Sequence, residues 1–154
     1  MFLEHFYMVD TVDRLDVDKG IIHCSATVPD ESPILGGHFP GFPIMPGVIL
    51  TETIAQSAGY LCYAESNCER MPFLVGIENA KFKGFVLPGQ AMTIEVERKK
   101  QTMGVSTFRG RIYVERKIVC QAKIRLRAMA FPTERLEEHM KDRSSSVGLA
   151  TLTA

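Results

Sequence analysis

Four residues that lie close together in the sequence have groups suited to acid–base chemistry. His38 lies in a loop rich in proline and glycine, and Gly47, Glu52 and Gln56 follow in the next segment. Imidazole exchanges a proton near physiological pH, and a carboxyl group in apolar surroundings tends to keep its proton. A backbone N–H group at a helix start can stabilise negative charge on a carbonyl oxygen. Together these groups suit proton removal next to a carbonyl, with loss or gain of a leaving group.

Each of these residues also has an ordinary structural interpretation. A single histidine in a loop usually has no catalytic role. Glu52 and Gln56 are one helical turn apart and would both fit a solvent-exposed stripe, and Pro46-Gly47 suits a plain helix start. His38 stands out because rigid backbone surrounds it and leads directly into the helix. The other histidines have no such setting: His5, His23 and His139.

Motifs of several other chemistries are absent from the sequence. It has no Ser-His-Asp signature, no phosphate-binding G-x-x-x-x-G-K and no H-E-x-x-H zinc motif. The four cysteines form no C-x-x-C pair, so we expect no metal site, and Cys62 and Cys120 fit apolar core positions. No cofactor is expected.

Length and charge place the chain in a broad class. The 154 residues favour one domain, and the 18 basic and 18 acidic residues give a net charge of zero, which argues against nucleic acid as a partner. No apolar run is long enough for a membrane span, and the start of the chain does not resemble a signal peptide. We therefore expect a cytoplasmic protein.

The hydrophobic pattern predicts an α+β domain. A helix over Val48 to about Ser66 is apolar on most sides, which is typical of a central helix. The prolines and glycines of residues 29–45 predict a loop without a helix. About six antiparallel strands alternate apolar and polar residues, so the sheet is expected to curl around the helix. They are predicted at 7–17, 21–28, 73–85 and near 92–97, 108–115 and 118–128.

Two parts of the chain are expected: a domain over residues 1–132 and a C-terminal tail over residues 133–154. The tail follows Pro132, where the strand pattern ends. The sequence of this tail predicts one short helix followed by a serine-rich, mobile end, so we expect the tail to be partly disordered.

The stretch HFPGFPIMPGVILTETIAQ, from His38 to Gln56, resembles the signature of the β-hydroxyacyl-acyl carrier protein dehydratases of the FabZ type. FLVGIENAKFKGFVLPGQ is similar to the second conserved stretch of that family, and the resemblance covers roughly Phe6 to Ala128. It implies a hot-dog fold, an antiparallel sheet around one long helix, in a homodimer with shared active sites. A trimer of dimers is left open.

The resemblance also implies a role for each of the four residues. His38 matches the base and Glu52 the acid, and these come from opposite subunits. The N–H group of Gly47 matches the group that binds the thioester carbonyl, and Gln56 matches the glutamine that supports the acid. The implied reaction converts (3R)-hydroxyacyl-acyl carrier protein to the trans-2-enoyl form in fatty acid biosynthesis. The related FabA type has aspartate as acid and also isomerises, so Glu52 indicates dehydration alone.

Some positions depart from the family pattern. Gly84 and Phe85 stand where the family usually has arginine and proline, and Gln90 replaces an aspartate. These departures leave the acyl preference open, including a branch for unusual or very long chains. Acyl carrier proteins are acidic, so basic side chains are expected to dock them. The candidates are Lys81, Lys83 and Arg98, with Lys99 and Lys100 beside them.

Two other functions fit a hot-dog domain. An acyl-CoA thioesterase would use Glu52 as base or nucleophile and would not need His38. A non-catalytic acyl-binding module would be expected to lack one of these two residues, whereas this chain has both.

Overall fold

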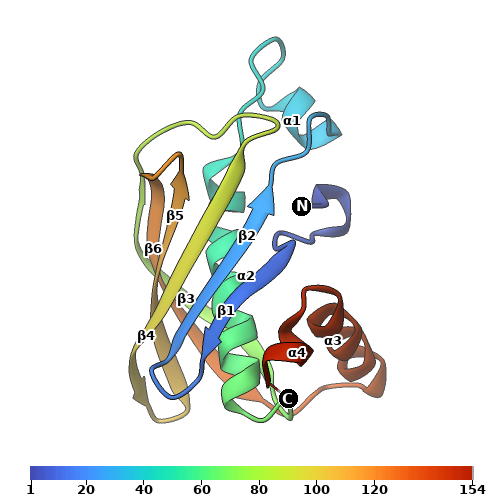
Figure 1. Ribbon diagram of the computed structural model, residues 1–154, viewed down its shortest axis with the longest axis vertical. Helices are drawn as coiled ribbons and strands as arrows, with labels where there is room; N and C mark the ends of the chain where they lie inside the picture. The colour runs from blue at the N-terminus through green and yellow to red at the C-terminus, as the bar shows by residue number, and fades with distance from the viewer. Residues whose placement is uncertain (154) are drawn as a thin grey trace.

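One sheet wraps around a long helix in the computed structural model, which describes residues 1–153 (Figure 1). The helix, α2, runs over Gly47–Glu65, and six antiparallel strands have the order β1-β2-β4-β5-β6-β3. The α+β prediction is confirmed. The strands are β1 Thr11–Asp16, β2 Ile21–Thr27, β3 Met71–Phe82, β4 Ala91–Thr102, β5 Val105–Val114 and β6 Lys117–Met129.

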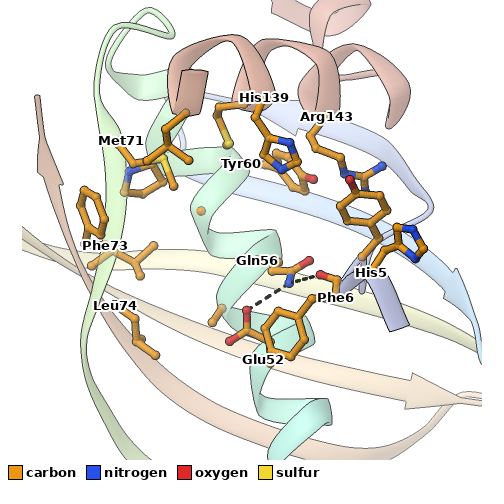
Figure 2. Close-up of a pocket in the computed structure, with 17 residues that line it drawn as sticks. His5, Phe6, Glu52, Gln56, Tyr60, Met71, Phe73, Leu74, His139 and Arg143 are labelled. Carbon is orange, nitrogen blue, oxygen red and sulfur yellow. Dashed lines mark hydrogen bonds between the residues drawn. The ribbon is translucent and has the colours of Figure 1, made fainter. Parts of the chain in front are cut away.

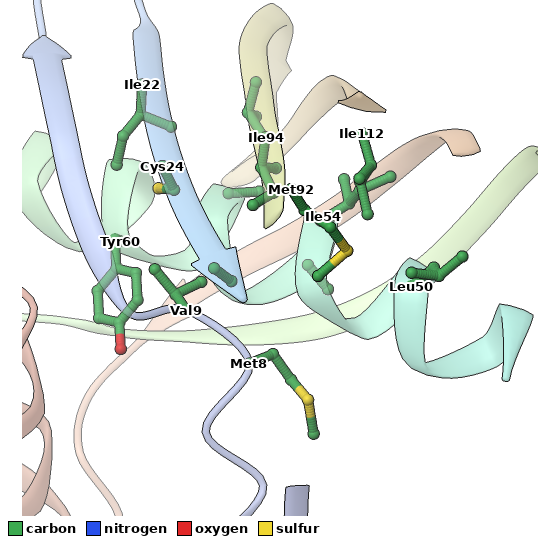
Figure 3. Packing of buried hydrophobic residues seen from close by; sticks show 14 of the residues in the cluster. Met8, Val9, Ile22, Cys24, Leu50, Ile54, Tyr60, Met92, Ile94 and Ile112 are labelled. Atoms are coloured by element: carbon green, nitrogen blue, oxygen red, sulfur yellow. The ribbon is translucent and has the colours of Figure 1, made fainter. Parts of the chain in front are cut away.

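Close packing between α2 and the sheet makes the core (Figure 3). Ile54 of α2 is fully buried, and the strands contribute Ile94 and Ile112 to the same cluster. Gly110 of β5 lies against Ile54, where an added Cβ atom would be only 2.0 Å from Ile54 Cγ2. The absence of a side chain at residue 110 therefore lets α2 approach the middle of the sheet.

The loop before α2 contains a short helix that the sequence did not lead us to expect. Helix α1 runs over Pro33–Gly37, so the prediction of a loop without a helix is wrong there. Pro33 fits the first turn because its missing N–H would have no helical partner. Ser32 caps this turn by accepting a hydrogen bond of 3.1 Å from the Ile34 N–H. The helix ends at the glycine pair, and His38 follows.

Two helices follow the sheet, where the sequence predicted one. Helix α3 runs over Glu134–Ser146 and includes the serine-rich stretch, and α4 runs over Leu149–Thr153. Val147 and Leu149 are buried, and the Val12 N–H of β1 donates to Val147 O at 2.8 Å. Both helices lie beside the open side of the sheet, near the N-terminal segment (Figure 1). The boundary after residue 132 and the disorder of the tail stay predictions, and Ala154 lies outside the described residues.

Cys62 and Cys120 are buried in the core, as expected, and Cys24 is buried as well. Within residues 1–153, no three His, Cys, Asp or Glu side chains are grouped so that they would hold a metal ion. No helix in this range is long and apolar enough to cross a membrane.

Candidate active site

A cavity of about 380 Å³ runs along one side of α2 and contains the predicted acid. Glu52, Gln56 and Tyr60 lie one turn apart on the α2 wall (Figure 2). Residues 71–74 of β3 form a second wall, residues 5–7 of the N-terminal segment a third, and α3 closes the far end. Most of the lining is apolar, which is the surrounding that a proton-donating carboxyl group needs.

Glu52 is half-buried in this lining rather than on a solvent-exposed stripe. Burial raises the pKa of its carboxyl group, and the hydrogen bond from Gln56 offsets part of this rise. The protonated form is therefore favoured more than in water, and that form can donate a proton.

Gln56 connects Glu52 to the N-terminal segment. Its Nε2 donates to Glu52 Oε1 at 3.0 Å and to the Phe6 carbonyl at 2.9 Å, while its Oε1 accepts from the Met8 N–H at 3.0 Å. The Met8 bond requires the amide oxygen on that side, so the NH₂ group faces Glu52. The amide thus holds the carboxyl group in one orientation.

The first turn of α2 has backbone N–H groups without an acceptor, next to the aromatic ring of Phe82. The N–H groups of Ile49 and Leu50 donate to Pro46 O, whereas those of Gly47 and Val48 have no acceptor in the described chain. A Cβ atom at residue 47 would lie 3.0 Å from the Phe82 ring, so only glycine leaves this approach open. The free N–H groups and the positive end of the helix dipole can stabilise an oxygen that gains negative charge.

His38 is held by the loop that precedes α2. Its Nδ1 lies 2.9 Å from Ile44 O, and its ring stacks on Phe39. A carbonyl oxygen only accepts hydrogen bonds, so Nδ1 carries the proton and Nε2 of the neutral ring is the basic atom. His38 is not among the residues that line the Glu52 cavity of the same chain.

The three basic residues predicted to dock a carrier protein lie at opposite ends of α2. Lys81 and Lys83 flank Phe82, which contacts the start of α2. Arg98 instead pairs with Glu65 at 2.6 Å, at the end of α2, and about 27 Å of helix separates the two places. They therefore do not form one patch, and the ion pair gives Arg98 a structural partner.

Comparison with known proteins agrees with this geometry. Residues 2–123 match the model of the FabA-like domain. The chain belongs to this family. It is 37% identical to the 3-hydroxyacyl-[acyl-carrier-protein] dehydratase FabZ of Shewanella woodyi over 128 residues, which cover 80% of this chain and 84% of that protein. The FabZ protein of Coxiella burnetii is 34% identical over 123 residues, 77% of this chain and 86% of that protein.

Solved structures share the fold of this FabA-like protein at low sequence identity. The dehydratase heterocomplex ApeI:P of Xenorhabdus doucetiae matches with a TM-score of 0.65 at 15% identity, over 89% of this chain and 90% of that one. The PaaI protein of E. coli matches with a TM-score of 0.58, also at 15% identity, over 73% and 75% of the chains. At this identity the likeness shows the fold alone.

Part of the cavity lining was not found from the sequence. Tyr60, His139 and Arg143 line the cavity, and so does His5. From the sequence, His5 and His139 were not expected near the site, because they lack the proline- and glycine-rich setting of His38, yet both line the cavity. Both come from segments far from α2 in the chain, so no local pattern could have joined them to Glu52.

The raised pKa of Glu52 predicts a pH-dependent loss of stability. The folded state binds the proton more tightly than the unfolded state, so stability is greatest below the ordinary glutamate pKa and falls as pH rises through the folded-state value. Glu52→Gln removes this loss. The unfolding free energy of the wild type minus that of Glu52→Gln, measured by denaturant titration, should therefore decrease from pH 4 to pH 7.

Glu31→Gln serves as the control, because Glu31 is an exposed carboxylate in a loop. A difference between wild type and Glu52→Gln that stays constant over this pH range would contradict the buried, proton-holding carboxyl group.

Proposed function

We propose that this FabA-like protein dehydrates (3R)-3-hydroxyacyl thioesters to trans-2-enoyl thioesters on an acyl carrier protein, in fatty acid biosynthesis. The observation that carries the proposal is Glu52, a carboxyl group with a raised pKa in an apolar cavity, oriented by Gln56. Curated relatives that cover most of the chain are named FabZ dehydratases, which supports the same reaction. No metal or cofactor is needed for it.

His38 is proposed to begin the reaction as the base. Its Nε2 lone pair takes the proton from the carbon next to the thioester carbonyl, while Nδ1–H remains bonded to Ile44 O. The electron pair of the broken C–H bond moves toward the carbonyl, whose oxygen gains negative charge. The N–H group of Gly47, which has no acceptor at the start of α2, is proposed to donate to that oxygen.

Glu52 is proposed to complete the reaction as the acid. Its protonated carboxyl donates to the 3-hydroxyl, the C–O bond breaks, and water leaves as the double bond forms. His38 then carries the extra proton and Glu52 is a carboxylate, so a proton passes from one to the other, through water, before the next turnover. Gln56, which donates to Glu52 Oε1, supports the carboxylate formed at this stage.

The active site is proposed to form between two copies of the chain. Within one chain His38 does not line the Glu52 cavity, which supports a second copy as the source of the base. Strand β3 lies at an edge of the sheet, and it exposes about half of each of four apolar side chains: Leu74, Val75, Ile77 and Phe82. An exposed apolar edge strand is a surface suited to pairing.

The proposal includes an acidic carrier protein as partner and the cytoplasm as location. Lys81 and Lys83 are exposed beside the start of α2, where the pantetheine arm of such a substrate would enter. Arg98 is left out of the docking surface because Glu65 binds it. Basic side chains near the entrance would steer an acidic partner toward it.

The first prediction from this mechanism concerns its two proton-transfer residues. His38→Ala and Glu52→Gln should each lower kcat/KM by about 10²–10⁴-fold, because each removes one acid–base group. The measurement is the absorbance of the conjugated enoyl thioester, with substrate added from either side of the equilibrium. Near wild-type rates, or release of free thiol in place of enoyl product, would contradict a dehydratase and favour a thioesterase.

A second prediction tests whether the two residues come from different chains. Inactive His38→Ala and Glu52→Ala proteins, dissociated and reassembled together in equal amounts, should recover roughly a quarter of the wild-type sites, because a symmetric dimer has two sites and pairing is random. Each variant reassembled alone is the control. Heterodimers that form but remain inactive would place both residues of a site in one subunit.

A third prediction concerns the carrier protein. The double variant Lys81→Glu, Lys83→Glu should slow turnover of carrier-bound substrate about tenfold at low salt, with a smaller effect at high salt, because it reverses charges that steer an acidic partner. Turnover of a short pantetheine substrate should change far less. The matched control is Lys99→Glu, Lys100→Glu on the distant end of β4, and a larger loss in that control would move the docking surface there.

A further inference from the structure

The end of the cavity farthest from the helix start has polar side chains from α3, His139 and Arg143, beside the apolar Leu136 and Met140. From Glu52 to Tyr60 the cavity follows eight residues of α2, about 12 Å. An extended chain of about ten bonds spans that length, at about 3.5 Å for every three bonds. At the far end, His139 and Arg143 of α3 lie over Tyr60, and His5 lies on the same side as Arg143 (Figure 2).

Arg143 is a half-buried cation that no carboxylate balances. Its Nη2 donates to Val9 O at 3.3 Å, its Nη1 donates to Ser146 Oγ at 2.8 Å, and its guanidinium lies 3.9 Å above the centre of the Tyr7 ring. No carboxylate of residues 1–153 lies within 4.0 Å of it. A guanidinium has five N–H donors, so these two bonds leave donors for a ligand.

The other polar groups at this end are donors as well. Tyr60 is buried except for 5% of its surface, and its hydroxyl lies beside Arg143. His5 and His139 add imidazole N–H groups to the same lining. Glu52 is the one acidic side chain that lines the cavity, and it lies two turns of α2 away, bonded to Gln56. The far end therefore offers hydrogen-bond donors and a cation with no anion.

A saturated chain ending in a methyl group would fit this end poorly. It would displace water from the guanidinium and the Tyr60 hydroxyl without replacing the lost hydrogen bonds, which is unfavourable. A terminal oxygen would accept from these donors, and a carboxylate would also balance the charge of Arg143.

We propose that α3 provides a distal subsite for acyl chains that end in an oxygen acceptor, a carboxylate or a hydroxyl group, with Arg143 and Tyr60 as its specificity-determining residues. This inference rests on the proposed dehydration. The family match ends at residue 123, before α3 begins, so the matched region includes Tyr60 but not Arg143.

The test uses three 3-hydroxyacyl-pantetheine substrates of equal length, with about ten bonds beyond the hydroxyl-bearing carbon. They end in a methyl, a hydroxyl or a carboxylate group, and kcat/KM is measured by enoyl absorbance. At least one oxygen-ended chain should exceed the methyl-ended chain by about tenfold or more, as expected for a hydrogen bond to a charged or buried donor. Preference for the carboxylate identifies the charge of Arg143 as the main contact, and preference for the hydroxyl identifies Tyr60. Equal or faster turnover of the methyl-ended chain would overturn the proposal.

Two variants assign the preference to the subsite. Arg143→Met and Tyr60→Phe should move the ratio of oxygen-ended to methyl-ended kcat/KM toward one. Tyr60→Phe keeps the buried ring, so it remains informative if Arg143→Met fails to fold. The control is Arg135→Met, a change to an exposed α3 residue outside the cavity lining, which should keep the wild-type ratio. A ratio unchanged in both subsite variants would overturn the assignment.

Wild-type protein with 3-hydroxybutyryl-pantetheine separates this inference from the proposed function. That substrate is too short to reach Tyr60. Failure to form its enoyl product would contradict the proposed dehydratase function itself. Turnover of this substrate without any preference among the long chains would contradict only the distal subsite.

Discussion

The site depends on keeping one carboxyl group in apolar surroundings while fixing its orientation. Glu52 receives a hydrogen bond from Gln56, and Gln56 is fixed in turn by the Phe6 carbonyl and the Met8 N–H. Without these backbone partners the amide would be free to rotate, and the carboxyl would lose its directed donor. The short N-terminal segment is therefore part of the candidate site, although Phe6 lies 50 residues before Gln56 in the chain. The same segment also forms one wall of the cavity.

The packing of α2 sets where this carboxyl can lie. Because residue 110 has no side chain, the helix sits close to the sheet at Ile54, and the face that carries Glu52 and Gln56 turns toward the open side. At the start of α2, the Phe82 ring packs closely against Gly47, and the N–H groups of Gly47 and Val48 have no backbone acceptor because they belong to the first helical turn. One helix thus carries both the N–H donor proposed for a developing oxyanion, at its first turn, and the proposed acid further along. Their separation is fixed by helix geometry rather than by flexible loops.

The two ends of the cavity differ in their side chains and in the chain segments that form them. Near the start of α2, the groups proposed for proton transfer lie within the region matched by the FabA-like family. Toward the end of α2, the lining is completed by α3, beyond that region, and it changes from apolar to donor-rich. Arg143 also bonds to Val9 O, so α3 is tied to the chain segment that holds Gln56 in place. Chemistry and substrate choice can therefore vary separately on one fold, with the central helix common to both.

Local patterns were enough to predict much of this protein. The apolar circumference of α2, the alternation of the strands and the candidate acid–base residues His38 and Glu52 can all be found in the sequence, because helix and strand periodicity and turn chemistry act over a few residues. The family signature adds their roles by resemblance. Helix α1 was missed because proline and glycine were taken to exclude a helix, whereas Pro33 occupies a first turn that Ser32 caps.

Tertiary structure alone decided which distant segments meet. It brought His5 and the Phe6 carbonyl to α2, placed His139 and Arg143 at the far end of the cavity, and separated Arg98 from Lys81 and Lys83 through the Glu65 ion pair. None of these contacts has a periodicity or spacing in the sequence, since each joins elements that only the wrapping of the sheet around α2 brings together. The sequence therefore determined the chemistry available at α2, and the packing of the two chain ends against that helix decided the shape and polarity of the space in which it would act.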